Sequence, residues 1–164
     1  MLNINLYLIF VALVLLSSAC SSKKEEGIYG FIEDESVRNT IFPLHDFIDA
    51  EAEVVCVLDP YQSEFSKVDL ESERFNKYLT NIAHVPKENY WSLMIASEAA
   101  IKKVDFSIAR KRFFLTQFEI DRGVGEKLMF PQGFTPKKCA VARKATIAKV
   151  ELKENIYLVF GEVE

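Results

Sequence analysis

The chain has 164 residues, of which 49% are hydrophobic and 13 are phenylalanine, and its formal net charge at pH 7 is −4. A chain of this size and hydrophobic content can bury the core of one domain, which excludes an intrinsically disordered protein, and its negative charge argues against nucleic acid as a partner. The charge is uneven, because residues 20–100 hold 7 basic and 16 acidic side chains whereas residues 101–164 hold 13 basic and 8 acidic ones. This pattern indicates either two solvated faces that happen to differ or a polarised surface that steers a charged protein partner.

Residues 6–16 form an apolar run of 11 residues near the N-terminus. A membrane-spanning helix needs about 20 apolar residues, so this run has the length of a signal-peptide core. Ser17, Ser18, Ala19 and Cys20 follow, which is the layout of a bacterial lipoprotein signal, although Ser17 takes the place of the usual leucine. In such a signal the Cys20 thiol receives a diacylglyceryl group, and cleavage makes Cys20 the new N-terminus. An ordinary secretory signal cut nearby, or a short membrane anchor, would explain the same run.

The expected domain organisation follows from this signal. Residues 1–19 are the predicted signal peptide, residues 20–27 a polar tether, and residues 28–164 a single β-rich periplasmic domain. Acyl chains on Cys20 would anchor the protein with about 0.8 kcal/mol for each buried methylene group. Residue 21 is serine and not aspartate, which by resemblance to the sorting of Gram-negative lipoproteins favours the outer membrane. We therefore expect a lipid-anchored protein on the periplasmic side of the cell envelope.

Cys56 and Cys139 are the two cysteines that remain once Cys20 is lipidated. In an oxidising periplasm such a pair predicts a disulfide. It would close a loop of roughly 80 residues and stabilise the fold by about 4 kcal/mol in the chain-entropy model. Two free buried thiols are the alternative, and they become the favoured prediction if the chain is not exported.

The strongest strand signal lies at residues 53–58, where valines surround Cys56 in a continuous apolar run. Such a run predicts a central strand that is covered on both faces, and it ends at Asp59 and Pro60 because proline cannot donate to a strand ladder. Weaker patterns predict short strands at residues 26–32, 41–42, 89–96, 104–109, 112–120 and 127–130.

One helix is predicted, over residues 69–83. Asp69 is a good N-cap residue, and Pro86 ends the helix because the residue before a proline avoids helical geometry. Four apolar side chains recur at spacings of three and four and therefore share one face, namely Phe75, Tyr78, Leu79 and Ile82.

Residues 139–152 are ambiguous, because their alanines suit a helix whereas their side chains alternate as in a strand. Glu154 and Asn155 form a hairpin turn into residues 156–162, so we interpret the segment as part of a closing β-hairpin. The expected fold is β-rich, all-β or α+β: a small antiparallel sheet or sandwich with one helix, pinned by a disulfide between Cys56 and Cys139.

The chain carries no phosphate-binding glycine loop and no nucleophile-elbow motif. It has two histidines, His45 and His84, and no local spacing links them to further metal ligands. His84, just after the helix, suits a surface or capping position. Asp59 is the best single candidate for an acid or base, although a turn acid beside a proline is its more common role. Cys56 is a poor nucleophile because burial raises the pKa of a thiol. We therefore predict no enzyme, no catalytic residue, no metal site and no cofactor, and no pattern singles out partner-binding residues.

Several segments together resemble a known family of small lipoproteins. They are the lipoprotein-like start, residues 56–62 (Cys-Val-Leu-Asp-Pro-Tyr-Gln), residues 76–79 (Asn-Lys-Tyr-Leu), Trp91, Cys139 and residues 160–163 (Phe-Gly-Glu-Val). The family comprises Gram-negative proteins described as type VI secretion immunity periplasmic lipoproteins, and the resemblance runs from about Val54 to the C-terminus. Its motifs are structural in kind, because they consist of a strand, a helix face and a cysteine pair.

The resemblance implies an envelope-anchored immunity protein that binds a secreted antibacterial toxin and occludes its active site. Such a protein would need a rigid surface and would be held at the membrane through the lipid on Cys20. One alternative is a structural or assembly lipoprotein of the envelope with no toxin partner. Another is a periplasmic hydrolase that uses scattered carboxylates, in which Asp59 would be the first residue to test.

Overall fold

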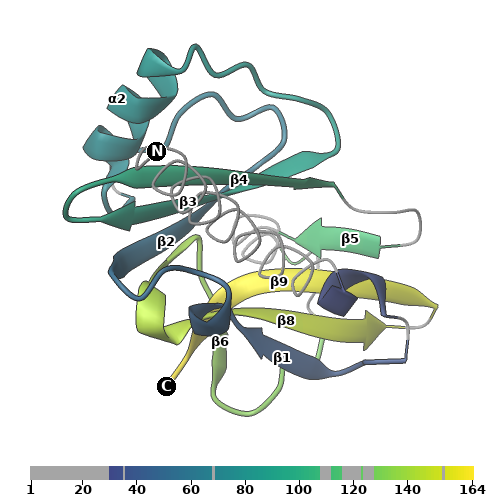
Figure 1. Ribbon diagram of the computed structural model, residues 1–164. Coiled ribbons are helices and arrows are strands. Elements are labelled where there is room, and N and C mark those ends of the chain that lie inside the picture. Colours follow the sequence, from purple (N-terminus) through teal and green to yellow (C-terminus); the bar gives the residue numbers. More distant parts are fainter. Residues whose placement is uncertain are drawn as a thin grey trace, which may run out of the picture.

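Two β-sheets packed face to face form the body of the protein, and a short helix covers the outer face of one sheet (Figure 1). The computed structural model describes residues 30–34, 36–67, 69–107, 112–115, 123, 128–152 and 154–164. The strands are β1 (Thr40–Pro43), β2 (Ala52–Leu58), β3 (Tyr90–Ser97), β4 (Ile101–Ser107), β5 (Arg112–Leu115), β6 (Phe134–Pro136), β7 (Cys139–Val141), β8 (Ala145–Leu152) and β9 (Asn155–Val163). The helices are α2 (Ser72–Asn81) and the 3-10 turns η1 (Leu44–Asp46) and η2 (Ala142–Lys144). The predicted β-rich fold with a short helix is confirmed.

The two sheets have different topologies. One sheet has the antiparallel order β4-β3-β2-β7. The other has the order β1-β8-β9-β5, in which β9 also pairs with β6, and β5 lies parallel to β9. The ambiguous segment 139–152 forms β7, η2 and β8, and β8 turns directly into β9. The interpretation of this segment as part of a closing hairpin is therefore confirmed.

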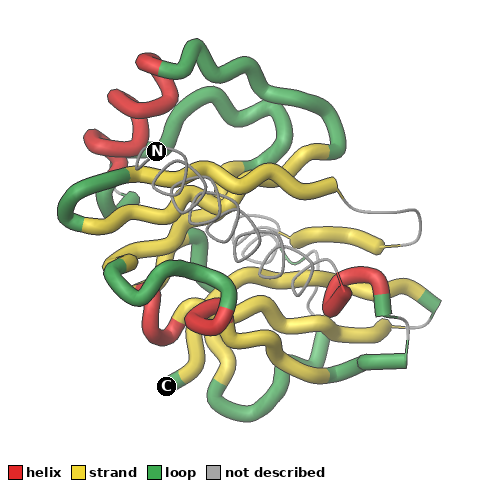
Figure 2. The backbone as a smooth tube through the Cα atoms, in the orientation of Figure 1, coloured by secondary structure: helices red, strands yellow, loops and turns green. Residues whose placement is uncertain are grey.

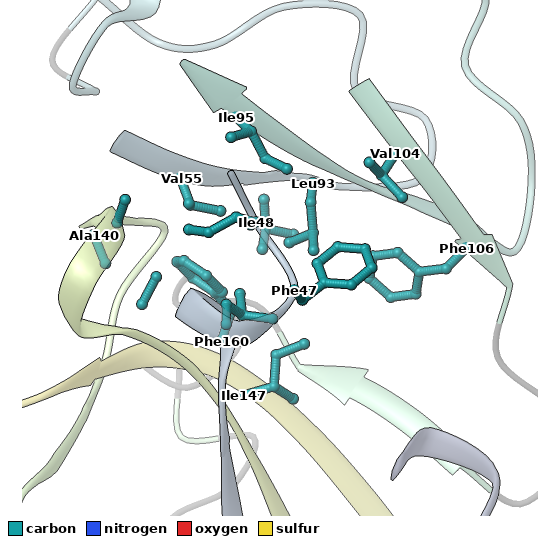
Figure 3. Close-up of a cluster of buried hydrophobic side chains, with 14 of the residues drawn as sticks. Phe47, Ile48, Val55, Leu93, Ile95, Val104, Phe106, Ala140, Ile147 and Phe160 are labelled. Atoms are coloured by element: carbon teal, nitrogen blue, oxygen red, sulfur yellow. The ribbon is translucent and has the colours of Figure 1, made fainter. Parts of the chain in front are cut away.

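The main hydrophobic core lies between the sheets (Figure 3). The first sheet contributes Val55 and Leu93, and the second contributes Ile147 and Phe160. Each of these residues exposes no more than 2% of its surface. In β4 the buried and exposed residues alternate, since Val104 and Phe106 are buried whereas the neighbours of Phe106 in the chain are exposed. This confirms the pattern predicted at residues 104–109 as far as Ser107, because residues 108 and 109 lie outside the described chain. Interdigitated side chains of this kind make the sandwich a rigid support.

Strand β2 is buried on both faces, which confirms its prediction as a central strand. Its inward side chains join the main core, whereas Cys56 and Leu58 pack beneath Phe75 and Leu79 of α2. The outer face of the second sheet is covered by a further apolar cluster that includes Leu128 and Phe134.

The chain at residues 128–130 is not in a strand, so the strand predicted over residues 127–130 is wrong for the part that the structure describes. Phe130 precedes Pro131, which cannot donate a hydrogen bond to a ladder. In contrast, β5 confirms the start of the strand predicted over residues 112–120, whose last five residues lie outside the described chain.

Helix α2 starts later than predicted. The Asp69 side chain does not cap it, because its carboxylate accepts a hydrogen bond from the Ser66 backbone N–H at 2.9 Å and pairs with Lys138 at 3.3 Å. The residue before the helix is instead Glu71, which has the left-handed φ of 56° and makes no side-chain cap. The preference of aspartate for helix N-caps was outweighed here by a turn and an ion pair that only the folded chain brings together.

The segment predicted as a strand at residues 26–32 is helical at residues 30–33, and residues 26–29 lie outside the described chain. The buried ammonium of Lys149 satisfies the carbonyl groups at the end of this turn. It donates to the Phe31 oxygen at 2.7 Å and to the Ile32 oxygen at 3.3 Å, and it also bonds the Asp34 oxygen. A cation at the C-terminal end of a helical turn is favourable, so Lys149 fixes the start of the domain to β8.

Candidate binding groove

A groove of about 290 Å³ opens where the end of β2 meets the loop after α2 and the strands β3 and β4. Figure 2 shows the long loop that leads from α2 into β3. The groove has a polar floor and a rim with several apolar side chains, and it is lined by Leu58, Asp59, Ile82, Ala83, His84, Val85, Pro86, Lys87, Tyr90, Ser92, Lys103 and Asp105. We call it the His84 groove.

The C-terminal end of α2 places His84 in the wall of this groove. Ala83 has a left-handed φ of 49°, its N–H donates to the Thr80 oxygen at 3.1 Å, and the His84 N–H donates to the Leu79 oxygen at 2.9 Å. These two bonds form a Schellman motif, which ends a helix by turning the chain out of it. The backbone of His84 therefore caps the helix, which confirms the capping role predicted for this residue. His84 itself is partly buried, so it does not occupy the alternative surface position.

The Nε2 atom of His84 is buried, and it has no hydrogen-bond partner among the described residues. His84 and Ala83 also line a second hollow of about 280 Å³, on the side of Glu64 and Asn76. His84 therefore borders two hollows. Buried polar atoms are normally satisfied, so this nitrogen is an exception within the described chain.

The floor of the His84 groove is a fixed set of polar groups from facing strands. Ser92 and Asp105 are cross-strand partners of β3 and β4, the Ser92 hydroxyl donates to the Asp105 carboxylate at 2.5 Å, and the Lys103 ammonium donates to the same oxygen. Burial alone would raise the pKa of Asp105, but the hydrogen bonds from Lys103 and Ser92 and the charges of Lys103 and Lys87 hold this pKa below its ordinary value.

This floor is suited to binding and not to nucleophilic catalysis. A serine is activated when a neighbouring base removes its proton, and a carboxylate whose pKa is lowered is a weaker base. Here the Ser92 hydroxyl donates to such a carboxylate, and its side chain is nearly fully buried. Together, Ser92, Lys103 and Asp105 can present a constant pattern of charges and hydrogen bonds to a ligand in the groove.

Exposed apolar side chains gather around the groove. Of the seven large hydrophobic side chains that are exposed in the described chain, three line it: Val85 is 70% exposed, Tyr90 46% and Ile82 45%. A fourth, Tyr61, is 73% exposed and lies two residues after Asp59, which lines the groove. Contiguous exposed apolar surface of this kind marks binding sites.

Of the five non-glycine residues with positive φ in the described chain, Ala83 at 49° lines this groove, and Tyr61 at 64° and Asn89 at 61° each lie within two residues of a lining residue. The left-handed region is costly for residues other than glycine and asparagine. Such conformations persist where the surrounding fold imposes them, and they cluster at functional sites.

The structure brings together two of the residues that the sequence singled out, because Asp59 and His84 both line the groove. His45 does not line the groove. It is exposed in η1, where its Nε2 atom lies 3.3 Å from the Asp46 Oδ1 atom. The described residues contain no group of three or more His, Cys, Asp or Glu side chains that could hold a metal ion. No sequence pattern singled out Ser92, Lys103 and Asp105, whose proximity depends on the register between β3 and β4.

The predicted disulfide is present between Cys56 and Cys139, with the Cα atoms 4.1 Å apart across β2 and β7. Cys56 is fully buried and bonded, so it cannot act as a nucleophile. A disulfide of this kind indicates an oxidising, extracytoplasmic location. Cys20, the signal peptide and the tether lie outside the described residues, within which no helix is both long and apolar enough to cross a membrane.

Ion pairs join the two parts of the chain that differ in charge. Asp69 of the acidic part pairs with Lys138 of the basic part at 3.3 Å, whereas the pair between Arg38 and Glu151 joins the minority charges of the two parts. Position along the chain is therefore a poor guide to the surface charge.

Comparisons with known protein families, with curated proteins and with solved structures find no match to this chain.

Proposed function

We propose that this protein is an envelope-anchored immunity lipoprotein that binds a secreted antibacterial effector and neutralises it by occlusion. The observation that supports a binding role is the His84 groove, where exposed apolar side chains surround a polar floor and a buried, unpaired imidazole nitrogen. Exposed aliphatic and aromatic side chains beside polar groups are common in protein–protein binding sites. The choice of an antibacterial effector rests on the sequence resemblance to type VI secretion immunity lipoproteins.

Occlusion requires a rigid surface and no chemistry of its own. The disulfide joins the central strand β2 to β7, and the loop after α2 is fixed at its start by the Schellman motif. A surface that is ordered before binding loses less conformational entropy when the complex forms. The groove would supply the central anchor point, and the surface around it would supply the rest of an interface of about 1,600 Å².

A competition on solid medium tests this proposal. A strain that lacks the gene is grown against its secretion-competent parent and, in parallel, against a parent whose secretion system is inactive. We expect the mutant to be killed only by the competent parent, and a plasmid copy of the gene to restore its survival. Equal survival of the mutant against both parents contradicts the proposal and favours a structural lipoprotein of the envelope.

A further inference from the structure

We infer that strand β4 pairs with β4 of a second copy of this chain and so forms a symmetric dimer. The two strands run antiparallel across a two-fold axis at Val104, and Lys103 of each copy lies opposite the partner's Asp105. The inference goes beyond the proposed function and does not depend on it, because it rests on the free edge of the first sheet and on the order of charges along that edge.

Strand β4 is the longest strand at the end of either sheet. The first sheet ends in β4 and β7, and the second ends in β1 and β5 (Figure 1). β4 has seven residues, whereas the other three strands have three or four residues each. All seven pair with β3 in an unbroken register, and no other described strand pairs with β4. The outer edge of β4 therefore presents a regular row of backbone donors and acceptors to which another strand can be added.

The order of charges along β4 is complementary to itself. Lys103, Val104 and Asp105 follow one another as a cation, a neutral residue and an anion. When two antiparallel copies pair with Val104 opposite Val104, Lys103 of each copy lies opposite the partner's Asp105. Opposite charges that face each other across antiparallel strands stabilise the pairing. The contact is made twice, since both copies contribute the same residues to a two-fold interface.

The same two charges select the register of the dimer. With the axis at residue 103 the two lysines would lie opposite each other, and with the axis at residue 105 the two aspartates would do so, which destabilises either pairing. Charged side chains on an edge strand normally prevent association with unrelated strands. Here they repel strands with another order of charges and accept a second copy in one register, so the specificity comes from both repulsion and attraction.

Both charged side chains are held in place before a second copy arrives. The Lys103 ammonium donates to the Asp105 carboxylate, and the Ser92 hydroxyl donates to the same oxygen at 2.5 Å. Groups that are ordered before association lose less conformational entropy when they form a contact. The Asp105 side chain is nevertheless 41% exposed, so its carboxylate can be reached from outside the chain.

The dimer brings two His84 grooves together on one face. Lys103 and Asp105 both line the groove, and they project from the same side of β4 because they are two residues apart. A two-fold axis perpendicular to the sheet keeps this side on the same face in both copies. The floors of the two grooves therefore meet across the axis, on a continuous sheet made from two four-stranded sheets.

Co-purification of two differently tagged copies tests the dimer. Full-length copies that carry two different C-terminal tags are expressed together in one cell, extracted in detergent and purified through one of the tags. We expect wild-type copies to co-purify. With Lys103→Asp in both copies carboxylates face each other across the axis, and with Asp105→Lys in both copies ammonium groups do. Each change should lower recovery of the second tag by about tenfold or more.

A mixed pair separates contacts across the axis from contacts within one chain. A Lys103→Asp copy and an Asp105→Lys copy restore opposite charges at both positions across the axis, so recovery should return to the wild-type level. Contacts within one chain cannot explain this rescue, because each copy keeps its own pair of like charges. Lys102→Asp in both copies is the matched control. Lys102 is exposed on the same strand and lies opposite the partner's uncharged Phe106, so this variant should keep co-purifying.

Folding of each variant is verified by thiol labelling, which must find the Cys56–Cys139 disulfide intact. If a charge-reversal variant does not fold, hydrogen exchange of the wild-type chain decides instead, because the amides of residues 101–107 should exchange more slowly as the protein concentration rises. Absence of co-purification of wild-type copies, equal recovery from like-charged and mixed pairs, or exchange in β4 that is independent of concentration would overturn the dimer. The edge of β4 would then be open to a strand of another protein.

Discussion

Cys56 and Cys139 lie directly opposite each other on antiparallel strands, with their Cα atoms 4.1 Å apart and a sequence separation of 83. The Val57 N–H donates to the Lys138 oxygen at 2.9 Å, so the neighbouring residues form a hydrogen-bonded pair. Because hydrogen-bonded and non-hydrogen-bonded pairs alternate along antiparallel strands, the two cysteines form a non-hydrogen-bonded pair. Strand β7 has only three residues and lies at a sheet edge. The covalent bond therefore holds a short edge strand to the centre of its sheet.

Removal of this disulfide should cost a large part of the stability of a domain this size. For a loop of this length the chain-entropy model gives about 4 kcal/mol, out of about 5–15 kcal/mol for a typical domain. We expect the double variant Cys56→Ala/Cys139→Ala to lower the free energy of unfolding in urea by about that amount. Thiol labelling of denatured but unreduced wild-type protein should detect neither cysteine, and quantitative labelling of both would contradict the disulfide.

Sequence patterns predicted the elements in which burial has a regular period. The apolar run of β2, the alternation in β4 and the β8–β9 hairpin all follow from which faces are covered. The start of α2 was wrong because Asp69 found partners in Ser66 and Lys138. These contacts, unlike the period of a strand, join residues whose proximity no local pattern records.

The groove was less predictable than the fold. Asp59 was recognised as a candidate acid or base and His84 as a surface or capping residue. Ser92 and Asp105, in contrast, are 13 residues apart in the chain and meet only through the register of two strands. Lys149 is a similar case, because a lysine in a strand normally indicates a solvated face. It is fully buried here, since the carbonyls of a distant helical turn satisfy it.

Asp105 should make the stability depend on pH at the acidic end. Its pKa is lower in the folded protein than its ordinary value of 3.8, so its ionised form stabilises the fold above that value, and this stabilisation is lost as the pH falls through the folded pKa. The carboxylate is 41% exposed, which limits the effect to about 0.5–1 kcal/mol. Asp105→Asn should therefore be less stable than the wild type at pH 7.

Urea unfolding at several pH values measures this difference. The gap between Asp105→Asn and the wild type should shrink steadily as the pH falls below about 4. It should also narrow at 1 M salt, because the contribution of Lys103 is partly screened, and a gap that stays constant from pH 7 to pH 2 would rule out this role for Asp105.

Ala83→Gly should stabilise the protein. Ala83 holds the left-handed position of the Schellman motif with φ of 49°, where glycine avoids the penalty of a Cβ atom. Glycine also gives the unfolded chain more freedom, so we expect a net gain of about 0.5–1 kcal/mol in the free energy of unfolding. Ala142→Gly, at a buried alanine in η2, is the control and should lower stability. A loss of stability in Ala83→Gly would contradict the assigned cap.

Gly161→Ala should strongly destabilise the second sheet. An added Cβ atom at this position would lie 2.2 Å from the Thr135 backbone oxygen and 2.7 Å from the Phe134 ring, where β6 pairs with β9. The backbone must move to admit it, at a cost of about 3 kcal/mol. Gly30→Ala is the matched control, since nothing lies within 4 Å of its added atom, and its stability in urea should match the wild type. Equal midpoints for both variants would show that β6 does not approach β9 this closely.

Cys20→Ala tests the membrane anchor, which the folded domain cannot report. The apolar run and the small residues that precede Cys20 predict lipidation of its thiol, and acyl chains contribute about 0.8 kcal/mol per buried methylene group to membrane binding. We therefore expect the wild type to sediment with membranes and Cys20→Ala to lose this attachment. A Cys20→Ala chain that is not exported would also be absent from the membrane, but its Cys56 and Cys139 thiols would stay reduced. The released protein must therefore still contain the Cys56–Cys139 disulfide for the result to report on the lipid anchor. Continued sedimentation of an exported, oxidised Cys20→Ala protein would reject the lipid anchor.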